Sequence, residues 1–328
     1  MDQSIRSDID EARRIAMSGE EVERETLLRF LELPDDSQET LYLRNTARQM
    51  RDELFGNKIT ITSAIGLDWA PCAGNCTFCS FGEKWGLVKD TLELSVKDVV
   101  GIIYGLFKRG YKGFTLRTTE FYDVGKLCDM GESIRKEVPG NFRLGANTGE
   151  LSYRDAEELY ESGFNSAYHT VRLREGIDTP LDPEMRMRTM KNIKRSGLQL
   201  AASIDPLGIE HTNDEILDKM YFLKQFETKQ MSVMRRVCVK GTPKGNYEPV
   251  SDERMAQIVA VLRIARSDWR VAGAQTSRPV LESGSGSFSI EIGASPRGKG
   301  MQLSDWKIMD HDAGKRLIAE SGCEFNEG

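Results

Sequence analysis

The stretch Ile61–Gly86, ITSAIGLDWAPCAGNCTFCSFGEKWG, carries the strongest signal in the chain for both fold and chemistry. It starts inside an apolar run, Ile59 to Ile65, which predicts a buried strand. Three of the six cysteines follow within eight residues, with the spacing C-x3-C-x2-C. They are Cys72, Cys76 and Cys79. Thiolates this close on one loop are typical ligands of zinc or of an iron–sulfur cluster. No fourth thiolate follows at similar spacing, so the pattern predicts a cluster with one metal position left open.

The spacing, directly after a first strand, resembles the signature of radical S-adenosylmethionine (SAM) enzymes. In that family three cysteines hold a 4Fe–4S cluster, and the fourth iron is chelated by the amino and carboxylate groups of SAM. One electron then splits the sulfonium into methionine and a 5′-deoxyadenosyl radical, which abstracts hydrogen from a substrate. Phe78 matches the aromatic residue usual before the third cysteine. The resemblance implies that Cys72, Cys76 and Cys79 bind one 4Fe–4S cluster per chain, with SAM as the second cofactor.

Two other readings of the triplet stay open. The cysteines could form part of a zinc site whose fourth ligand is Cys128, Cys238, Cys323 or one of the three histidines. Cysteines are also often buried for packing alone.

Length and composition limit the class of protein. The chain has 328 residues, enough for one large α/β barrel or two small domains. A net charge of −6 argues against nucleic acid as a partner, and no apolar run is long enough for a membrane span. The polar, acidic start MDQSIRSDIDEARR is not a secretory signal. We therefore expect a cytoplasmic protein with no nucleic-acid or membrane partner and a need for low oxygen.

Residues 1–57 show apolar positions at helical spacing among many charges. Three helices are predicted, at 7–19, 20–33 and 40–55, and the last one stops at Gly56-Asn57. Arg51 and Phe55-Gly56-Asn57 resemble the end of the N-terminal helix of biotin synthase and its relatives, although a plain helical cap on a barrel floor fits as well. The predicted division is a helical extension, 1–57, and a radical SAM barrel domain, 58–328.

From residue 58 on, strand and helix patterns alternate, which predicts parallel strands joined by right-handed crossovers. The expected fold is an α/β (βα)8 TIM-type barrel, complete or nearly complete, with an N-terminal helical extension. Only the link 276–285 is short and ambiguous. Strands are predicted near 58–66, 113–119, 142–148, 166–173, 198–205, 231–239, 270–275 and 287–293. Helices are predicted near 95–109, 123–137, 153–162, 183–196, 213–227, 251–267 and 304–321.

In such barrels the chemistry lies at the carboxyl ends of the strands. The strand near 113–119 ends at Glu120, which resembles the family's contact to the SAM amino group, although it could merely cap the next helix. The strand near 142–148 ends at Glu150, which resembles a strand end of the hydrogenase maturase but could equally be an exposed helix charge.

The strand near 166–173 leads into His169, Arg172, Arg174 and Glu175. Arginine there could pair with the SAM carboxylate, and the resemblance favours Arg172 together with Glu175. An ordinary Arg/Glu surface pair is the alternative. His169 fits a satisfied interior histidine as well as a catalytic one.

Two further strand ends resemble adenosine-binding segments of the family. The resemblance places Ser203 and Asp205 beside the nucleoside, and it places Thr242, in a Gly-Thr-Pro turn, near it as well. Arg235 and Arg236 could reach an anionic substrate or serve the structure.

The sequence is thus similar to radical SAM enzymes of the biotin synthase, hydrogenase maturase and methylornithine synthase group. The resemblance implies hydrogen abstraction from a small molecule in cofactor or metabolite biosynthesis, a low-potential flavodoxin or ferredoxin as donor, and a monomer or homodimer. No catalytic residue is predicted. One alternative is sulfur insertion of the lipoyl or biotin synthase type, with a second cluster possible only from Cys128, Cys238 and Cys323. Another is an enzyme of iron-guanylylpyridinol cofactor biosynthesis, suggested by Glu291 and Ser295-Pro296-Arg297. A zinc-binding or scaffold protein without catalysis is the third.

Overall fold

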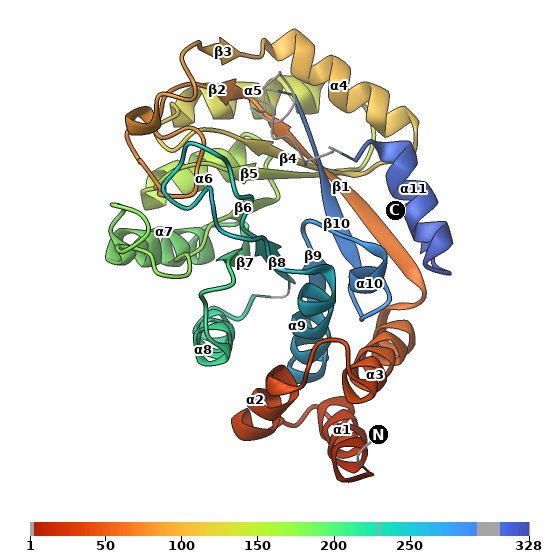
Figure 1. Cartoon of the computed structure of the whole chain (residues 1–328). Helices are drawn as coiled ribbons and strands as arrows, with labels where there is room; N and C mark the ends of the chain where they lie inside the picture. Colours follow the sequence, from red (N-terminus) through yellow and green to blue (C-terminus); the bar gives the residue numbers. More distant parts are fainter. Residues whose placement is uncertain (1–2, 229, 294–308, 328) are drawn as a thin grey trace.

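The computed structural model describes residues 3–228, 230–293 and 309–327. Within these ranges eight parallel strands close into a barrel, because β10 pairs with β1 from Thr60–Ser287 to Gly66–Gly293 (Figure 1). A short strand, β11, adds to the start of β1 at Lys58 and Ile59. The predicted TIM-type barrel is therefore confirmed. The barrel strands are β1 (Lys58–Gly66), β4 (Gly113–Arg117), β5 (Arg143–Asn147), β6 (Ser166–Tyr168), β7 (Gln199–Leu207), β8 (Gln230–Arg235), β9 (Arg270–Gly273) and β10 (Ser287–Gly293).

Helices follow the strands in the alternating order that the sequence predicts, and a two-stranded ribbon of β2 (Asp68–Trp69) and β3 (Leu92–Glu93) follows β1. The link between β9 and β10 holds only the short α10 (Arg278–Leu281). The remaining helices are α4 (Val96–Lys108), α5 (Val124–Glu137), α6 (Tyr153–Glu161), α7 (Pro183–Arg195), α8 (Asn213–Lys224), α9 (Asp252–Ala265) and α11 (His311–Glu320). The final strand is β11 (Glu324–Phe325), and a 3-10 turn, η1 (Glu83–Trp85), lies after the cysteines. None of the helices in the described ranges is long and apolar enough to cross a membrane.

Local sequence explains where these helices begin. Ser95, Ser152 and Thr212 each form a capping box with the acidic residue three positions on. Such reciprocal bonds satisfy backbone N–H groups that the first turn of a helix leaves open.

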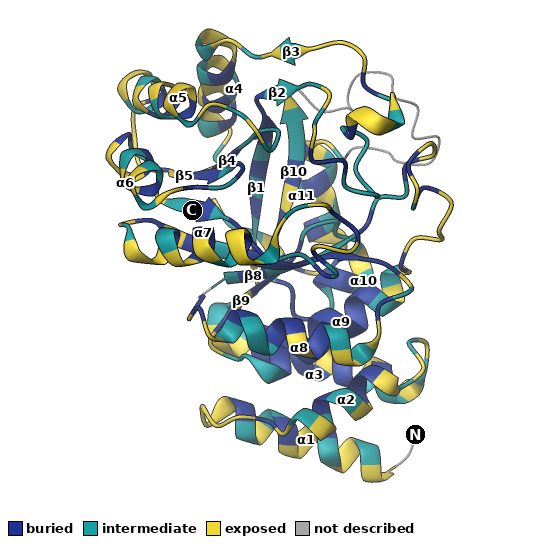
Figure 2. Cartoon of the chain, turned by 90° about the vertical axis from the view of Figure 1, so that its left-hand side faces the viewer, coloured by how far each residue is buried: buried dark blue, intermediate teal, exposed yellow. Residues whose placement is uncertain are grey.

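The N-terminal helices are α1 (Gln3–Met17), α2 (Arg24–Glu32) and α3 (Gln38–Phe55), and they pack on α9 (Figures 1 and 2). Every residue of α9 from Met255 to Ile264 is buried, so this helix lies between the barrel and the N-terminal helices. Gln257, fully buried, donates to the carbonyl oxygens of Phe30 and Leu33. Residues 1–57 thus share a core with the barrel, and a division at residue 57 remains only a proposal.

Several predicted elements have other bounds in the structure, and the strand expected at 231–239 ends at Arg235. The strand expected at 166–173 ends at Tyr168, because the next residues form a loop in which the Arg172 N–H donates to Glu175. The helix expected at 304–321 begins at His311, because Asp310 caps it by accepting from the Ala313 N–H. Residues 294–308, which include Ser295-Pro296-Arg297, lie outside the described ranges.

The inside of the barrel is hollow. An eight-stranded barrel has an interior just wide enough to be filled by large side chains. Here β1 points Thr60, Thr62 and Ala64 inward and β10 points Ser287 and Ser289 inward, and none of these five is buried. Small side chains leave a cavity of about 770 Å³.

Candidate active site at the barrel mouth

The cysteine loop, residues 70–86, folds back on itself after β2. The Cys72 N–H donates to the Phe81 carbonyl (2.7 Å), and the Glu83 N–H donates to the Cys72 carbonyl (3.1 Å). The Cys79 N–H donates to the Cys76 carbonyl (3.0 Å). The loop is therefore compact, and its three cysteine side chains all line the barrel cavity.

The three thiols are spread more widely than the ligands of one ion. Among the described residues, a single set of three His, Cys, Asp or Glu side chains has its ligand atoms all within 4.8 Å of one another, and it is not the cysteine set. Tetrahedral zinc with bonds of about 2.3 Å needs sulfur atoms roughly 3.8 Å apart. Burial raises the pKa of the Cys76 thiol to about 12, so a thiolate there needs a bound cation. The spread fits a multi-iron cluster better than zinc.

The middle of the cysteine loop is anchored to two other loops through Thr77. Its N–H donates to the Asp178 carbonyl (2.9 Å), and its own carbonyl accepts from the Lys244 N–H (3.0 Å). The Lys244 ammonium in turn pairs with the carboxylates of Asp178 and Glu210. These contacts fix the loop between Cys76 and Phe78.

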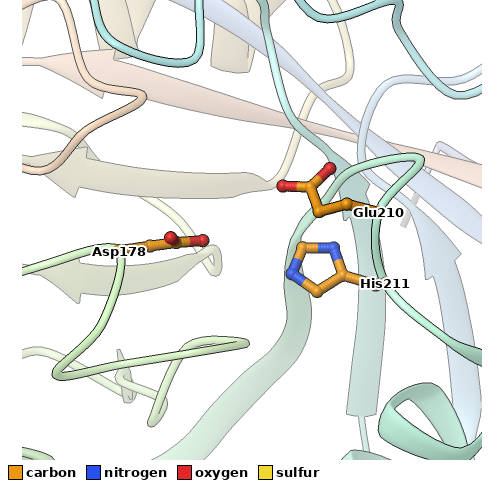
Figure 3. A group of neighbouring side chains, drawn as sticks. All are labelled: Asp178, Glu210 and His211. Atoms are coloured by element: carbon orange, nitrogen blue, oxygen red, sulfur yellow. The ribbon is translucent and has the colours of Figure 1, made fainter.

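Asp178, Glu210 and His211 are the set with ligand atoms within 4.8 Å of one another (Figure 3). Arg236 pairs with both oxygens of Glu210 (2.5 and 2.9 Å), while Lys244 bridges the two carboxylates. Because these two cations already balance the two carboxylates, we interpret the group as an ion-pair network and not as a metal site.

Glu120 follows the end of β4 and lines the cavity. Its Oε2 accepts from Arg186 Nη2 (2.8 Å), and its Oε1 is buried without a hydrogen-bond partner. It therefore does not act only as a helix cap. Sequence reasoning missed Arg186, which is 2 % exposed and comes from α7. The available signal was its place on the same helix face as Met190 and Ile193, the buried side of an amphipathic helix.

Glu150 belongs to the same network. Arg186 Nε lies 3.2 Å from Glu150 Oε1, and Thr189 Oγ1 donates to Glu150 Oε2. His169 Nε2 lies 3.3 Å from Oε2, and burial lowers the pKa of this histidine. Glu150 is thus not a free surface charge, and His169 is a bonded interior histidine.

Arg172 lines the cavity and Glu175 lies behind it. Glu175 accepts from the backbone N–H of Arg172 (2.8 Å), and its side chain is 1 % exposed. Arg174 turns away and pairs with Glu215 (2.7 Å). Among the residues of this segment, Arg172 is the cation that faces the cavity.

Ser203 and Asp205 on β7 also line the cavity, beside Tyr168 on β6. The Tyr168 hydroxyl lies 2.5 Å from Ser203 Oγ and donates to Asp205 (3.0 Å). Burial raises the pKa of Asp205, and the Arg172 charge opposes that effect. Sequence reasoning missed Tyr168, although its place at a strand end was a usable signal.

The other predicted residues differ in whether they line the cavity. Phe78 lines the cavity. Thr242 does not, since it is buried and donates to the Val239 carbonyl (2.8 Å). Arg235 lines the cavity but is paired with Asp252 (2.6 Å).

The remaining cysteines do not join the triplet. Cys128 is half-buried on α5, and Cys323 is buried and accepts from Arg51 Nη2 (3.4 Å). Neither these two nor Cys238 is among the described residues that line the cavity.

Comparison with known proteins agrees with this geometry. No family model matches the chain. Biotin synthase from Clostridium botulinum is 24 % identical over 260 residues, which cover 74 % of this chain and 80 % of that protein. The chain is similar to radical SAM enzymes of the biotin synthase-like group.

Two solved structures share the fold. Methylornithine synthase (PylB) superposes with a TM-score of 0.82 at 15 % identity, covering 96 % of this chain and 97 % of that one. The [FeFe]-hydrogenase maturase HydG superposes with a TM-score of 0.81 at 16 % identity, covering all of this chain and 80 % of HydG. Radical SAM enzymes as a family imply a 4Fe–4S cluster and SAM.

Proposed function

We propose that Cys72, Cys76 and Cys79 hold one 4Fe–4S cluster and that SAM binds in the cavity beside it. The observation that supports it most directly is that one cavity is lined by the three cysteines and by the charged residues Glu120 and Arg172 that follow strand ends. The cysteine loop also leaves room around sulfur, since a Cβ added at Gly74 would lie 3.2 Å from Cys72 Sγ. The Gly74 N–H donates to that sulfur (3.4 Å), a contact of the kind that tunes iron–sulfur potentials.

Held by these three thiolates, such a cluster would supply the low-potential electron needed for reductive cleavage of SAM. The chain's own residues position the nucleotide. Glu120 Oε1 would accept from the SAM ammonium, and Arg172 would pair with its carboxylate. Ser203 and Asp205 would bind the nucleoside. Phe78 would lie beside the cofactors.

Two of the predicted cofactor-binding residues would act indirectly, by positioning other residues. Glu175 would orient Arg172, through the bond to its backbone N–H. Thr242 would fix the turn that contains Lys244, next to the cysteine loop.

The proposed reaction is hydrogen abstraction from a small polar molecule, followed by rearrangement or fragmentation, with a flavodoxin- or ferredoxin-type electron donor. The cavity offers both signs of charge to a substrate, because Arg117 on β4 pairs with Glu291 on β10 (3.0 Å) and both line it. Small-molecule chemistry fits a space of this size.

A second candidate is sulfur insertion, which the likeness to biotin synthase favours. Against it, no cysteine outside the triplet is among the described residues that line the cavity, so a sulfur-donating cluster has no thiolate ligands there. Iron analysis separates the two, with about four irons per chain for one cluster and about eight for two.

The test is anaerobic reconstitution with iron and sulfide, followed by reduction in the presence of SAM. We expect a brown protein with about four irons that releases 5′-deoxyadenosine and methionine. Cys76→Ala should lose both properties, whereas the matched variant Cys128→Ala, on the outer helix α5, should keep them. Zinc uptake in place of iron, or intact SAM with the wild-type protein, would refute the proposal.

A further inference from the structure

The cavity that begins at the cysteine loop extends to the opposite end of the barrel. Its lining includes residues at the amino ends of the strands, among them Lys58 on β1, Arg143 on β5 and Arg270 on β9. These three side chains are exposed, so the cavity reaches solvent at this face, which we call the floor. A TIM barrel is normally closed here by packed side chains.

Small residues keep the passage open between the floor and the mouth. Thr60 and Ser287 face each other across the β1–β10 pair near the floor, and both are only partly buried. Gly113 lies beside Thr62, where an added Cβ would come within 2.9 Å of the threonine methyl group. Hydroxyl groups and backbone thus form part of the lining, together with apolar residues such as Phe55 and Phe142.

Charge divides the lining into two halves. Toward the floor every charged side chain among the described lining residues is a cation: Lys58, Lys112, Arg143, Arg263 and Arg270. The lining carboxylates, Asp68, Glu120, Asp205 and Glu291, lie in the carboxyl-terminal half.

Two cations of the floor, Arg143 and Arg263, bond to neutral groups. Arg143 Nη2 donates to the neutral amide of Gln199 (2.6 Å). Arg263 is fully buried and bonds only to backbone carbonyls, while burial and the charges of Arg51 and Arg270 lower its pKa to about 9. Two exposed carboxylates lie outside the lining: Asp268 pairs with Arg266 and its charge also acts on Arg263, and Glu324 lies beside Lys58 in the β1–β11 pair.

We propose that the floor of the barrel is a second opening, through which small anions bearing a carboxylate or other oxyanion group enter or leave the cavity without passing the cysteine loop. Cations gathered at an opening attract anions and raise their local concentration. The mouth is occupied by the cysteine loop and the proposed cofactors, so a second opening lets a small reactant or fragment exchange while they stay bound.

The test places a thiol inside the passage and measures its reactivity, without any turnover. Ser287→Cys in the reconstituted holoenzyme is treated with a methanethiosulfonate that carries either a sulfonate or a trimethylammonium group. Labelling is quantified by peptide mass spectrometry, with native Cys128 as the internal reference. We expect the anionic reagent to be favoured at position 287, relative to Cys128, by roughly 10-fold or more.

Two further arms identify the opening. Replacing Lys58, Arg143 and Arg270 together by Gln should bring the preference at position 287 down to that of Cys128. Adding SAM, which closes the mouth, should leave the labelling rate unchanged, whereas Thr60→Trp should abolish it by filling the floor side. If Thr60→Trp does not fold, the proposal is tested by the triple Gln variant of Lys58, Arg143 and Arg270 and by the addition of SAM.

Competition with inorganic phosphate distinguishes free oxyanions from the charged end of a longer substrate as the group that the floor takes. Slower labelling with phosphate supports a floor that takes free oxyanions. Charge-selective labelling that phosphate leaves unchanged supports a floor that holds the charged end of a longer substrate. An unreactive residue 287, or labelling blocked by SAM and indifferent to the triple Gln variant, would overturn the proposal. None of these outcomes depends on SAM cleavage, so this test can fail while the proposed function stands.

Discussion

At the residue scale, Arg186 determines the charge balance behind the candidate site. It is a buried cation that lies within 4 Å of three carboxylates, those of Glu120, Glu150 and Glu175. Removing one partner of a buried ion pair leaves charge uncompensated in a low-dielectric environment, which is costly.

We expect Arg186→Met to destabilise the fold by about 3–5 kcal/mol. Urea unfolding measures the effect. The matched control is Arg188→Met, two residues further along α7 and exposed, which should change stability by less than about 0.5 kcal/mol. Equal unfolding midpoints for the two variants would contradict the role of Arg186.

Lys219 on α8 gives a prediction about pH. Its ammonium donates to Thr170 Oγ1 (2.9 Å), and burial lowers its pKa to about 7, against the opposing charges of Asp205 and Glu175. The ordinary pKa of lysine is about 10.4 in an unfolded chain. Between these two values the unfolded chain binds more protons than the folded one, so Lys219 makes stability rise with pH.

Lys219→Met should therefore remove part of that rise. We expect the gain in unfolding free energy from pH 7 to pH 9 to be roughly 2 kcal/mol smaller in the variant than in the wild type. Lys191→Met, at an exposed position of α7, is the control and should follow the wild-type curve. Parallel curves of unfolding free energy against pH for wild type and Lys219→Met would show that folding does not lower the pKa of Lys219.

At the element scale, the cysteine loop depends on loops that follow other strands. Thr77 is held by the backbone of Asp178 and Lys244, and these two residues are joined by their own ion pair. Because the three contacts act together, loss of the Lys244 charge should loosen the segment between Cys76 and Phe78.

We expect Lys244→Met to release iron to a chelator several-fold faster than the wild-type reconstituted protein, with an unchanged circular dichroism spectrum. The control is Lys240→Met, an exposed lysine of the same loop. The rate of chelate formation is followed by absorbance. Identical rates for the two variants would mean that the ion pair does not hold the loop.

Sequence patterns predict elements better than they predict such loops. The capping residues Ser95, Ser152 and Thr212 mark helix starts within a few positions, and each has its observed partner three residues on. By contrast, Asp178 and Lys244 are 66 residues apart, and nothing local couples them. Arg186 was missed for the same reason, because its carboxylate partners come from other strands.

At the scale of the whole molecule, the N-terminal helices complete the core. Helix α9 is buried along its length and would expose apolar surface if α1 and α2 were absent. Phe30 and Leu27 on α2 are themselves fully or almost fully buried.

Deletion of residues 1–36 should therefore give a protein that binds the dye ANS and melts without a cooperative transition. The physical reason is the newly exposed face of α9, whose burial would otherwise contribute about 25 cal/mol per Å². Leu41→Ala, at a residue 40 % exposed on α3, is a control and should leave the melting temperature nearly unchanged. A truncated chain that melts cooperatively at the wild-type temperature would show that residues 1–36 are dispensable.

The barrel as a whole follows from the alternation of strand and helix patterns, and the described structure confirms it. Its hollow interior was not predicted, because Thr60, Thr62 and Ser287 look like ordinary strand residues until the barrel shows which face points inward. The rim of cations was missed as well, since Lys58, Arg143 and Arg270 come from separate strands and meet only when the sheet closes.

The pairing of β1 with β10, which closes the barrel, also sets an order of events in the growing polypeptide. β1 leaves the ribosome early, yet the strand that completes its far side comes much later, as the contact between Thr62 and Ser289 spans 227 positions. Until then β1 has an unpaired edge, and the adjacent thiols are open to oxygen and to stray metals. Contacts this distant along the chain form slowly. Loading of the proposed 4Fe–4S cluster would therefore follow translation, once β10 has paired with β1.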